Sequence, residues 1–87
     1  MEVIFLPDAE DDLSYWVATG NKAIIKKISQ LIDDIKLHPY SGIGKPELLK
    51  YNLAGAWSRR INREHRLVYE VEDNFVLILS AKGHYLL

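Results

Sequence analysis

The 87-residue sequence has no cysteine and no long apolar run. Without cysteine the chain can form neither a disulfide nor a thiolate zinc site, which suits a reducing compartment, so we expect a cytoplasmic protein. The longest unbroken apolar run, residues 75–79, has five residues, whereas a membrane-spanning helix needs roughly 20. The N-terminus also lacks the basic and apolar regions of a secretory signal. We therefore expect no membrane partner.

The chain is also short and nearly neutral. With 26% charged and 48% hydrophobic residues, it predicts one small domain spanning residues 1–87, with no room for a second core. Such a chain buries only roughly 60 to 65% of the surface that it exposes when unfolded, and we therefore expect a homodimer to add stability. A net charge of −1 argues against a free nucleic-acid binder, which usually carries a basic excess.

The apolar pattern of the first half predicts a strand and a helical hairpin. A β-branched, apolar segment over residues 1–6 predicts a buried strand that Pro7 ends. A helix follows with Asp8 as its N-cap, and Gly20 and Asn21 end it and begin a second helix, which stops before Pro39. An apolar stripe marks the buried face of the second helix: Ile24, Ile28, Leu31 and Ile35.

The second half predicts a loop and four strands. Two glycines and a proline in residues 40–46 indicate the loop, and the strands cover residues 48–53, 56–61, 65–71 and 75–81. Their short connections favour an antiparallel meander. The order predicts an α+β fold, with a strand, a two-helix hairpin and then an antiparallel sheet that carries both helices on one face.

Charge is unevenly distributed along the chain. Residues 1–40 hold seven acids and four bases, whereas residues 41–87 hold five acids and seven bases. Residues 44–66 have a net charge of +4, because only Glu47 and Glu64 oppose six bases: Lys45, Lys50, Arg59, Arg60, Arg63 and Arg66. Such a stretch suits a polyanionic ligand, although charged runs often form solvated faces.

The arginines of this stretch lie on neighbouring predicted strands. If the connecting loop is residues 62–64, Arg60 lies opposite Arg66; if it is only residues 63–64, Arg59 shares a face with Arg66. Either register brings two like charges together, which is unfavourable without compensation. A nearby Glu would compensate structurally, and a bound phosphate or an acidic partner segment would do so functionally.

Several catalytic classes lack the residues that they need. No helical i, i+4 ligand pair supports a zinc site among the candidate ligands, and we expect no metal or other cofactor. The sequence also has no G-x-S-x-G nucleophile elbow and no phosphate-binding glycine loop. The candidate ligands that we considered are His38, His65, His84 and Glu47.

Three aromatic residues have roles that the sequence leaves to packing or binding. Trp16 falls on the apolar stripe of the first helix and predicts a core position. Trp57 and Tyr51 lie beside the basic strand, where they either pack or stack on a nucleic-acid base; we favour packing.

Four short segments together carry a family resemblance. They are GKPELLK at residues 44–50, WSRRI at 57–61, EHRLVY at 64–69 and the terminal His84-Tyr85. These segments resemble the YoeB (Txe) toxins of bacterial toxin-antitoxin pairs, within the RelE-like superfamily. The similarity extends over nearly the whole chain, including residues 11–12, 15–16 and 26–28.

The resemblance implies a RelE-like, microbial-ribonuclease-type fold and a ribosome-dependent endoribonuclease, or mRNA interferase, that cuts mRNA in the ribosomal A site. It also implies a YefM-type antitoxin as partner. On the matching positions Glu47 would be the general base and Arg66 the phosphate-binding cation. His84 would be the general acid and Tyr85 would position the substrate. Lys50 and Arg59 match RNA contacts of the family, and the basic stretch adds Lys45 and Arg60 as RNA-binding candidates.

The chemistry of RNA cleavage is compatible with these roles. A base must take the 2′-hydroxyl proton, an acid must protonate the departing 5′-oxygen, and positive charge must stabilise the phosphorane. Leu86 and Leu87 extend beyond the tyrosine that the family pattern places near the end. The alternative function is a non-catalytic, antitoxin-binding module or a gyrase-directed toxin, because relatives with the same fold act on gyrase.

Overall fold

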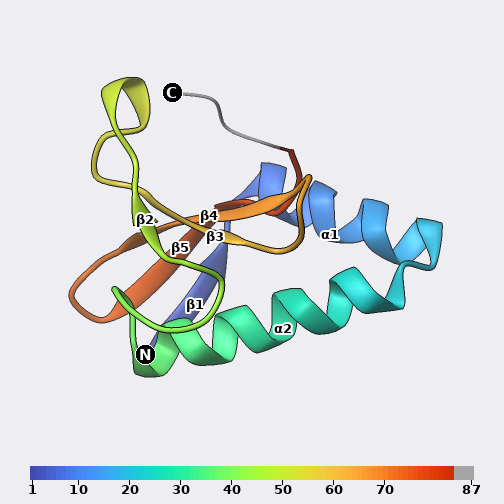
Figure 1. Ribbon diagram of the computed structural model, residues 1–87, viewed down its shortest axis with the longest axis horizontal. Coiled ribbons are helices and arrows are strands. Elements are labelled where there is room, and N and C mark those ends of the chain that lie inside the picture. Colours follow the sequence, from blue (N-terminus) through green and yellow to red (C-terminus); the bar gives the residue numbers. More distant parts are fainter. Residues whose placement is uncertain (84–87) are drawn as a thin grey trace.

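A mixed β-sheet and two helices form the fold in the computed structural model, which describes residues 1–83 (Figure 1). The sheet order is β1-β5-β4-β3-β2, with β1 parallel to β5 and every other pair antiparallel. The predicted α+β class is confirmed, and the meander is extended by β1. The elements are β1 (Glu2–Phe5), α1 (Pro7–Thr19), α2 (Lys22–Leu37), β2 (Glu47–Leu48), the 3₁₀ turn η1 (Tyr51–Leu53), β3 (Trp57–Arg60), β4 (Arg66–Val71) and β5 (Phe75–Ser80).

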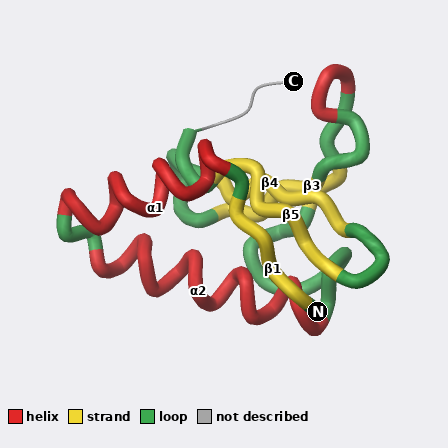
Figure 2. Tube along the Cα trace, turned by 180° about the vertical axis from the view of Figure 1, so that it is seen from behind, coloured by secondary structure: helices red, strands yellow, loops and turns green. Residues whose placement is uncertain are grey.

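Both helices cover the same face of the sheet, as predicted, and form a hairpin (Figure 2). The stripe of α2 is buried against residues such as Leu67 and Ile78 of the central strands. Trp16 of α1 is buried as well, and its indole Nε1 donates to the Ala81 carbonyl at 2.9 Å. The opposite face has a smaller cluster, formed by Leu49, Ala56, Val68, Leu53 and Leu79.

The helix boundaries agree with the predicted signals except at the first N-cap. Gly20 has the left-handed backbone of a C-terminal cap (φ 68°), and the Asn21 side chain accepts from the Ile24 amide at 3.2 Å. The prediction that Asp8 caps α1 was wrong, because Leu6 occupies that position and Pro7 is the first helical residue. Proline ends the strand and starts the helix, since its fixed φ already suits a first helical turn.

The predicted strand over residues 48–53 is largely replaced by a turn. Only Glu47 and Leu48 pair with β3, after which the Leu49 amide donates to the Ala56 carbonyl and the chain enters η1. Leu49 and Leu53 then pack into the same small cluster. Residues four apart share a face in a strand as well as in a helical turn, so this spacing does not distinguish the two structures.

The β3–β4 hairpin adopts the first of the two predicted registers. Arg60 lies opposite Arg66, so the loop is residues 62–64, and Arg59 points to the other face. The Asn62 side chain fixes this turn by accepting from the amides of Glu64 and His65, at 2.9 and 2.8 Å.

Arg59 is a fully buried charged residue, and its guanidinium group needs hydrogen-bond acceptors within the chain. Its side chain is 0% exposed, and all five of its N–H donors are used within the chain. Nε donates to the Tyr69 hydroxyl at 3.1 Å, and one Nη1 hydrogen bonds the Asp34 carboxylate. The other three donors bind backbone carbonyls of the loop after α2, namely those of His38, Ser41 and Ile43.

The partners of Arg59 add further ties to that loop. Asp34 also accepts from the Ile43 amide at 3.1 Å, and the Tyr69 hydroxyl donates to the Pro39 carbonyl at 2.8 Å. Burial raises the pKa of the Tyr69 phenol, so the hydroxyl stays protonated and can donate while it accepts from Arg59. We call Arg59, Asp34 and Tyr69 the arginine clasp. The clasp fixes the loop that leads from α2 to β2.

We expect Arg59→Met to lower the free energy of unfolding by about 3 to 5 kcal/mol, because it leaves the Asp34 charge and several loop carbonyls without their partner. Urea unfolding monitored by circular dichroism measures this change. Arg60→Met is the matched control on the adjacent exposed position and should shift stability by less than about 0.5 kcal/mol. Equal losses for the two variants would contradict the structural role of Arg59.

The clasp also predicts a pH dependence of stability. The hydrogen bond from Arg59 is the main cause that lowers the pKa of Asp34 below its ordinary value of 3.8. A lowered native pKa stabilises the fold above that ordinary value, and the contribution is lost as pH falls through the native pKa. The stability difference between the wild type and Asp34→Asn should therefore shrink below about pH 4. A difference that stayed constant in acid would contradict the assignment; urea titrations at a series of pH values measure it.

Candidate RNA-cleavage site

The helix-free face of the sheet collects several of the polar residues that the sequence predicts to be functional. Because side chains alternate along a strand, Ser58 and Arg60 of β3 share this face, whereas Arg59 between them faces the helices. The register places Glu47 of β2 opposite Ser58, and Arg66 of β4 opposite Arg60. Three strands therefore bring a carboxylate and two guanidinium groups to one surface.

Arg66 is held in place by its neighbours on this face. Its side chain is only 12% exposed, and Nη1 donates to the buried Ser58 hydroxyl at 3.2 Å. The same nitrogen lies 3.7 Å from a carboxylate oxygen of Glu47, which is 58% exposed. A nearby Glu, the structural one of the two compensations that the sequence left open, is therefore present beside the paired arginines. The arrangement combines a fixed cation with a solvent-accessible carboxylate.

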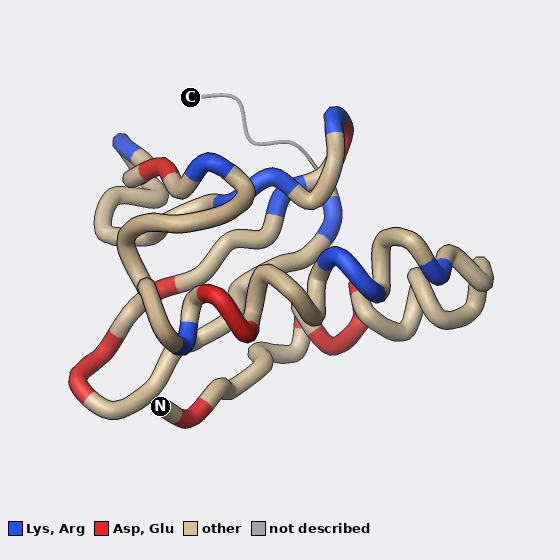
Figure 3. The backbone as a smooth tube through the Cα atoms, turned by 60° about the horizontal axis from the view of Figure 1, so that its bottom comes forward, with Lys and Arg blue, Asp and Glu red and all other residues tan. Residues whose placement is uncertain are grey.

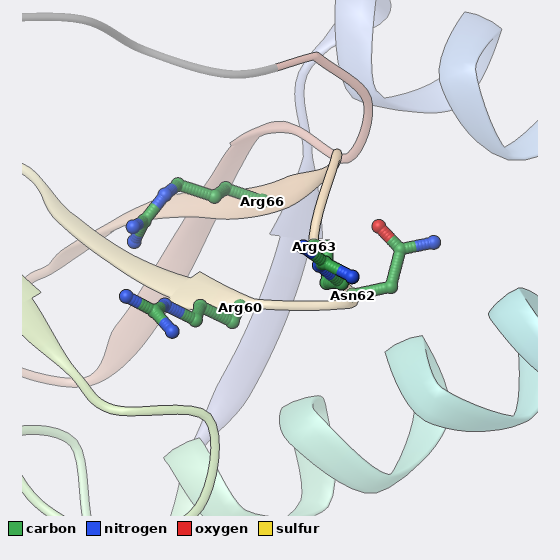
Figure 4. Close-up of a pocket in the computed structure, with 4 residues that line it drawn as sticks. All are labelled: Arg60, Asn62, Arg63 and Arg66. Atoms are coloured by element: carbon green, nitrogen blue, oxygen red, sulfur yellow. The ribbon is translucent and has the colours of Figure 1, made fainter.

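A pocket of about 170 Å³ adjoins Arg66 (Figure 4). Arg60 and Arg66 extend in the same direction from neighbouring strands, and Arg63 and Asn62 lie at the end of the hairpin. No acidic residue is among those that line this pocket. Its guanidinium groups suit the oxygens of a phosphate.

The remaining basic candidates fall into two groups. Lys45 and Lys50 are exposed, Lys45 in the loop before β2 and Lys50 directly before η1. Arg59 does not join them, and the expectation that it contacts RNA has to be corrected. The structure buries its guanidinium on the opposite face, where its donors bind Asp34, Tyr69 and backbone carbonyls of the loop after α2.

The two aromatic residues beside the basic strand differ from one another. Trp57 packs against the core under the helices, and its ring centroid lies 5.2 Å from that of Tyr40, so the packing prediction is confirmed. The prediction of packing was wrong for Tyr51, because this residue is 77% exposed. Its backbone is left-handed (φ 59°). A bulky residue rarely adopts that conformation, and η1 enforces it here because Leu49 and Leu53 anchor the turn on both sides.

The end of the described chain is tied directly to Arg66. The Arg66 amide donates to the Gly83 carbonyl at 3.0 Å, and the Gly83 amide donates to Nδ1 of His65 at 3.0 Å. The His65 ring packs edge-on against Trp16, with centroids 4.7 Å apart. The sequence suggested His65 only as a metal ligand, and its part in holding Gly83 could not be seen from spacing. The candidates His84 and Tyr85, and the extension Leu86-Leu87, lie outside the described residues.

Residues 5–85 match the family described as YoeB-like toxin of bacterial type II toxin-antitoxin system. The chain belongs to this family. It is 51% identical to Toxin YoeB of Escherichia coli (strain K12) over 98% of this chain and 100% of the relative. The resemblance stated from the sequence is confirmed.

Solved structures of YoeB proteins from Staphylococcus aureus share the fold closely. One is a heterotetrameric complex of YoeB and YefM, 48% identical with a TM-score of 0.87, and the other is a YoeB dimer, 48% identical with a TM-score of 0.89. Each alignment covers 98% of both chains.

Residues 1–83 contain neither a candidate metal centre nor a candidate membrane span. Nowhere in this range do three or more His, Asp or Glu side chains gather as they would around a metal ion. Neither helix of the described chain has the length and apolar character to span a membrane.

The anchoring of Gly83 by His65 can be measured directly. We expect His65→Leu to speed hydrogen exchange of the Gly83 amide about fivefold, since a net hydrogen bond is worth about 1 kcal/mol. His65→Asn, whose amide oxygen can replace Nδ1 as acceptor, should retain most of the protection. The Ala81 amide, which donates to Asp12 at 2.9 Å, is the internal control in the same NMR spectra. Unchanged exchange at Gly83 in the leucine variant would show that the bond contributes nothing.

Proposed function

We propose that this YoeB-family chain is a ribosome-dependent endoribonuclease that cleaves mRNA in the ribosomal A site and so inhibits translation. The observation that carries this proposal is the pairing of Glu47 with Arg66 on the open face of the sheet, 3.7 Å apart, beside a pocket lined by arginines. A base and a phosphate-binding cation at that separation can act on one phosphodiester group.

In the proposed reaction the 2′-oxygen attacks the adjacent phosphorus. Glu47 takes the 2′-hydroxyl proton, and Arg66 stabilises the negative charge that gathers on the phosphate oxygens. The bond between phosphorus and the 5′-oxygen breaks, and His84 protonates that leaving oxygen. The products are a 2′,3′-cyclic phosphate and a free 5′-hydroxyl. Because these side chains supply the base, the acid and the charge, the reaction requires no metal.

The chain geometry up to Gly83 supports the parts given to His84 and Tyr85. The Gly83 carbonyl accepts a hydrogen bond from the Arg66 amide, and His84 is the next residue in the sequence. The last described residue thus lies beside the residue that would hold the scissile phosphate. Tyr85 would position the substrate, as the family resemblance implies.

Exposed cations around the site would bind the rest of the RNA. Lys45, Lys50 and Arg60 keep this role, because all three are exposed. Lys45 and Lys50 lie on either side of β2, which carries Glu47, and Arg60 is on the neighbouring strand β3. Arg59 is removed from the RNA-binding set, since all of its donors already bind Asp34, Tyr69 or loop carbonyls. Near-neutral net charge gives a weak long-range field, which suits dependence on the ribosome to present the mRNA.

A YefM-type antitoxin is the proposed protein partner in the cytoplasm, and a homodimer the proposed assembly. The support comes from the S. aureus relatives, one in complex with YefM and one a dimer. The exposed arginine face offers a physical means of neutralisation. An antitoxin segment that brings carboxylates to Arg60 and Arg66 would cover the pocket that the mRNA phosphate requires.

We expect Arg66→Ala to reduce cleavage of mRNA on programmed ribosomes by about 10²- to 10³-fold, because it removes one preorganised charge from the phosphate. Glu47→Gln should reduce cleavage by about 10²- to 10⁴-fold through loss of the base. The measurement is the rate at which new mRNA 5′ ends appear.

Lys22→Ala serves as the control, since Lys22 is exposed at the start of α2 and lies outside the pocket beside Arg66. It should cleave at the wild-type rate. Urea unfolding of each variant separates loss of chemistry from loss of fold. Wild-type cutting by Arg66→Ala would refute the site assignment. Intact mRNA with the wild type, together with inhibition of gyrase, would support the gyrase-directed alternative instead.

A further inference from the structure

The hollow beside Arg66 continues around the hairpin to helix α2. Arg60, Asn62 and Arg63 line the pocket that contains Arg66, and the same three residues line a second pocket of about 340 Å³. The second pocket adds Lys45 from the loop and Lys27 from α2. The shared walls make one continuous surface, which we call the cationic track: Arg66, Arg60, Asn62, Arg63, Lys45 and Lys27.

The track carries charge of one sign. Five of its six residues are cations, and neither pocket has an acidic residue in its lining. Within residues 1–83, only Arg66 of these five forms an ion pair, the one with Glu47. Most Lys and Arg segments lie on one side of the molecule and most Asp and Glu segments on the other (Figure 3). Clustered cations without counter-charges favour an anionic ligand.

The walls of the track are fixed by backbone contacts. The Arg60 amide donates to the Gly44 carbonyl at 2.7 Å, which fastens the loop before β2 to the end of β3. Gly44 has a φ of 80°, and a Cβ there would lie 2.7 Å from the Leu31 side chain. The positive φ would strain another residue, and its Cβ would also lie 3.2 Å from the Arg60 carbonyl, so glycine favours this close approach, which brings the neighbouring Lys45 to the side of Arg60. The loop that carries Lys45 is thus held between α2 and β3, and this contact fixes one side of the track.

We propose that the cationic track binds the phosphate backbone of the RNA strand where it leaves the cleavage site, extending the RNA contact to Arg63 and to Lys27 on α2. The inference rests on the proposed function, because it begins at Arg66 as the residue that holds the scissile phosphate. Neighbouring phosphates of RNA are linked covalently through a ribose. A strand bound at Arg66 must therefore continue along an adjacent surface. The track is such a surface, and it offers cations in succession.

The test uses the full chain and a short, uncleavable 2′-O-methyl RNA oligonucleotide. We expect Lys27→Gln combined with Arg63→Gln to weaken binding at low salt by at least about tenfold, because removal of even one charge-assisted hydrogen bond costs about 1.5 kcal/mol. The slope of log K against log salt should decrease by about 0.7 for each phosphate that the variant no longer neutralises. The charge-preserving pair Lys27→Arg and Arg63→Lys should restore both quantities.

Lys22→Gln is the matched control, because it removes one positive charge from α2 outside the track. It should leave the salt slope at its wild-type value. An unchanged affinity and slope in the Lys27 and Arg63 double variant would overturn the proposal. So would a double variant that loses an oligoglutamate probe but keeps the RNA, since the track would then be a site for an acidic protein segment.

The binding assay separates this inference from the proposed function, because it requires no cleavage. If wild-type protein cuts mRNA on ribosomes while the double variant binds the oligonucleotide normally, the track fails and the enzyme assignment stands. If the track binds RNA and ribosomal mRNA stays intact, the enzyme assignment fails.

Discussion

The arginine clasp is the interaction on which the rest of this structure depends. The donors of the buried Arg59 guanidinium have hydrogen-bond partners only because α2, the loop that follows it and β4 all supply acceptors. That requirement ties the loop to the sheet, and the loop ends in the strand that carries Glu47. A buried charge that loses a partner costs far more than a surface pair. The position of Glu47 therefore depends on an arginine whose side chain lies on the opposite face of the sheet.

Much of the fold could be predicted because several independent signals agree. The α2 stripe and the Gly20-Asn21 junction each indicate the same helical hairpin, and the structure has both. The sequence prediction was wrong where a local residue pattern is compatible with two different backbone structures. Pro7 can end a strand or start a helix, and it does both, which displaces Asp8 from the cap. The leucines at 49 and 53 suit an extended strand by composition but pack together as a turn.

The candidate site was predictable only in part, for a different reason. Arg59 and Arg60 are adjacent and chemically identical, and only strand register decides that one is buried and the other faces the pocket. The sequence left that register open, although both versions correctly put two arginines beside each other. Glu47 and Arg66 were named through family resemblance, and the structure brings them together. The contact of His65 with Gly83 joins residues far apart in the chain, so nothing in local spacing could reveal it.

The division of the sheet into a helix-covered face and an open face separates two kinds of mutational constraint. Substitutions among Arg60, Arg63 and Lys45 change exposed side chains and leave the packed side untouched. Such positions can vary in charge and shape at little cost in stability, whereas the core beneath them cannot. The ligand and partner contacts of these exposed positions can therefore change while the packed scaffold stays the same. Arg59 is an exception among the basic residues of β3, because its buried side chain stabilises the scaffold and is not free to vary.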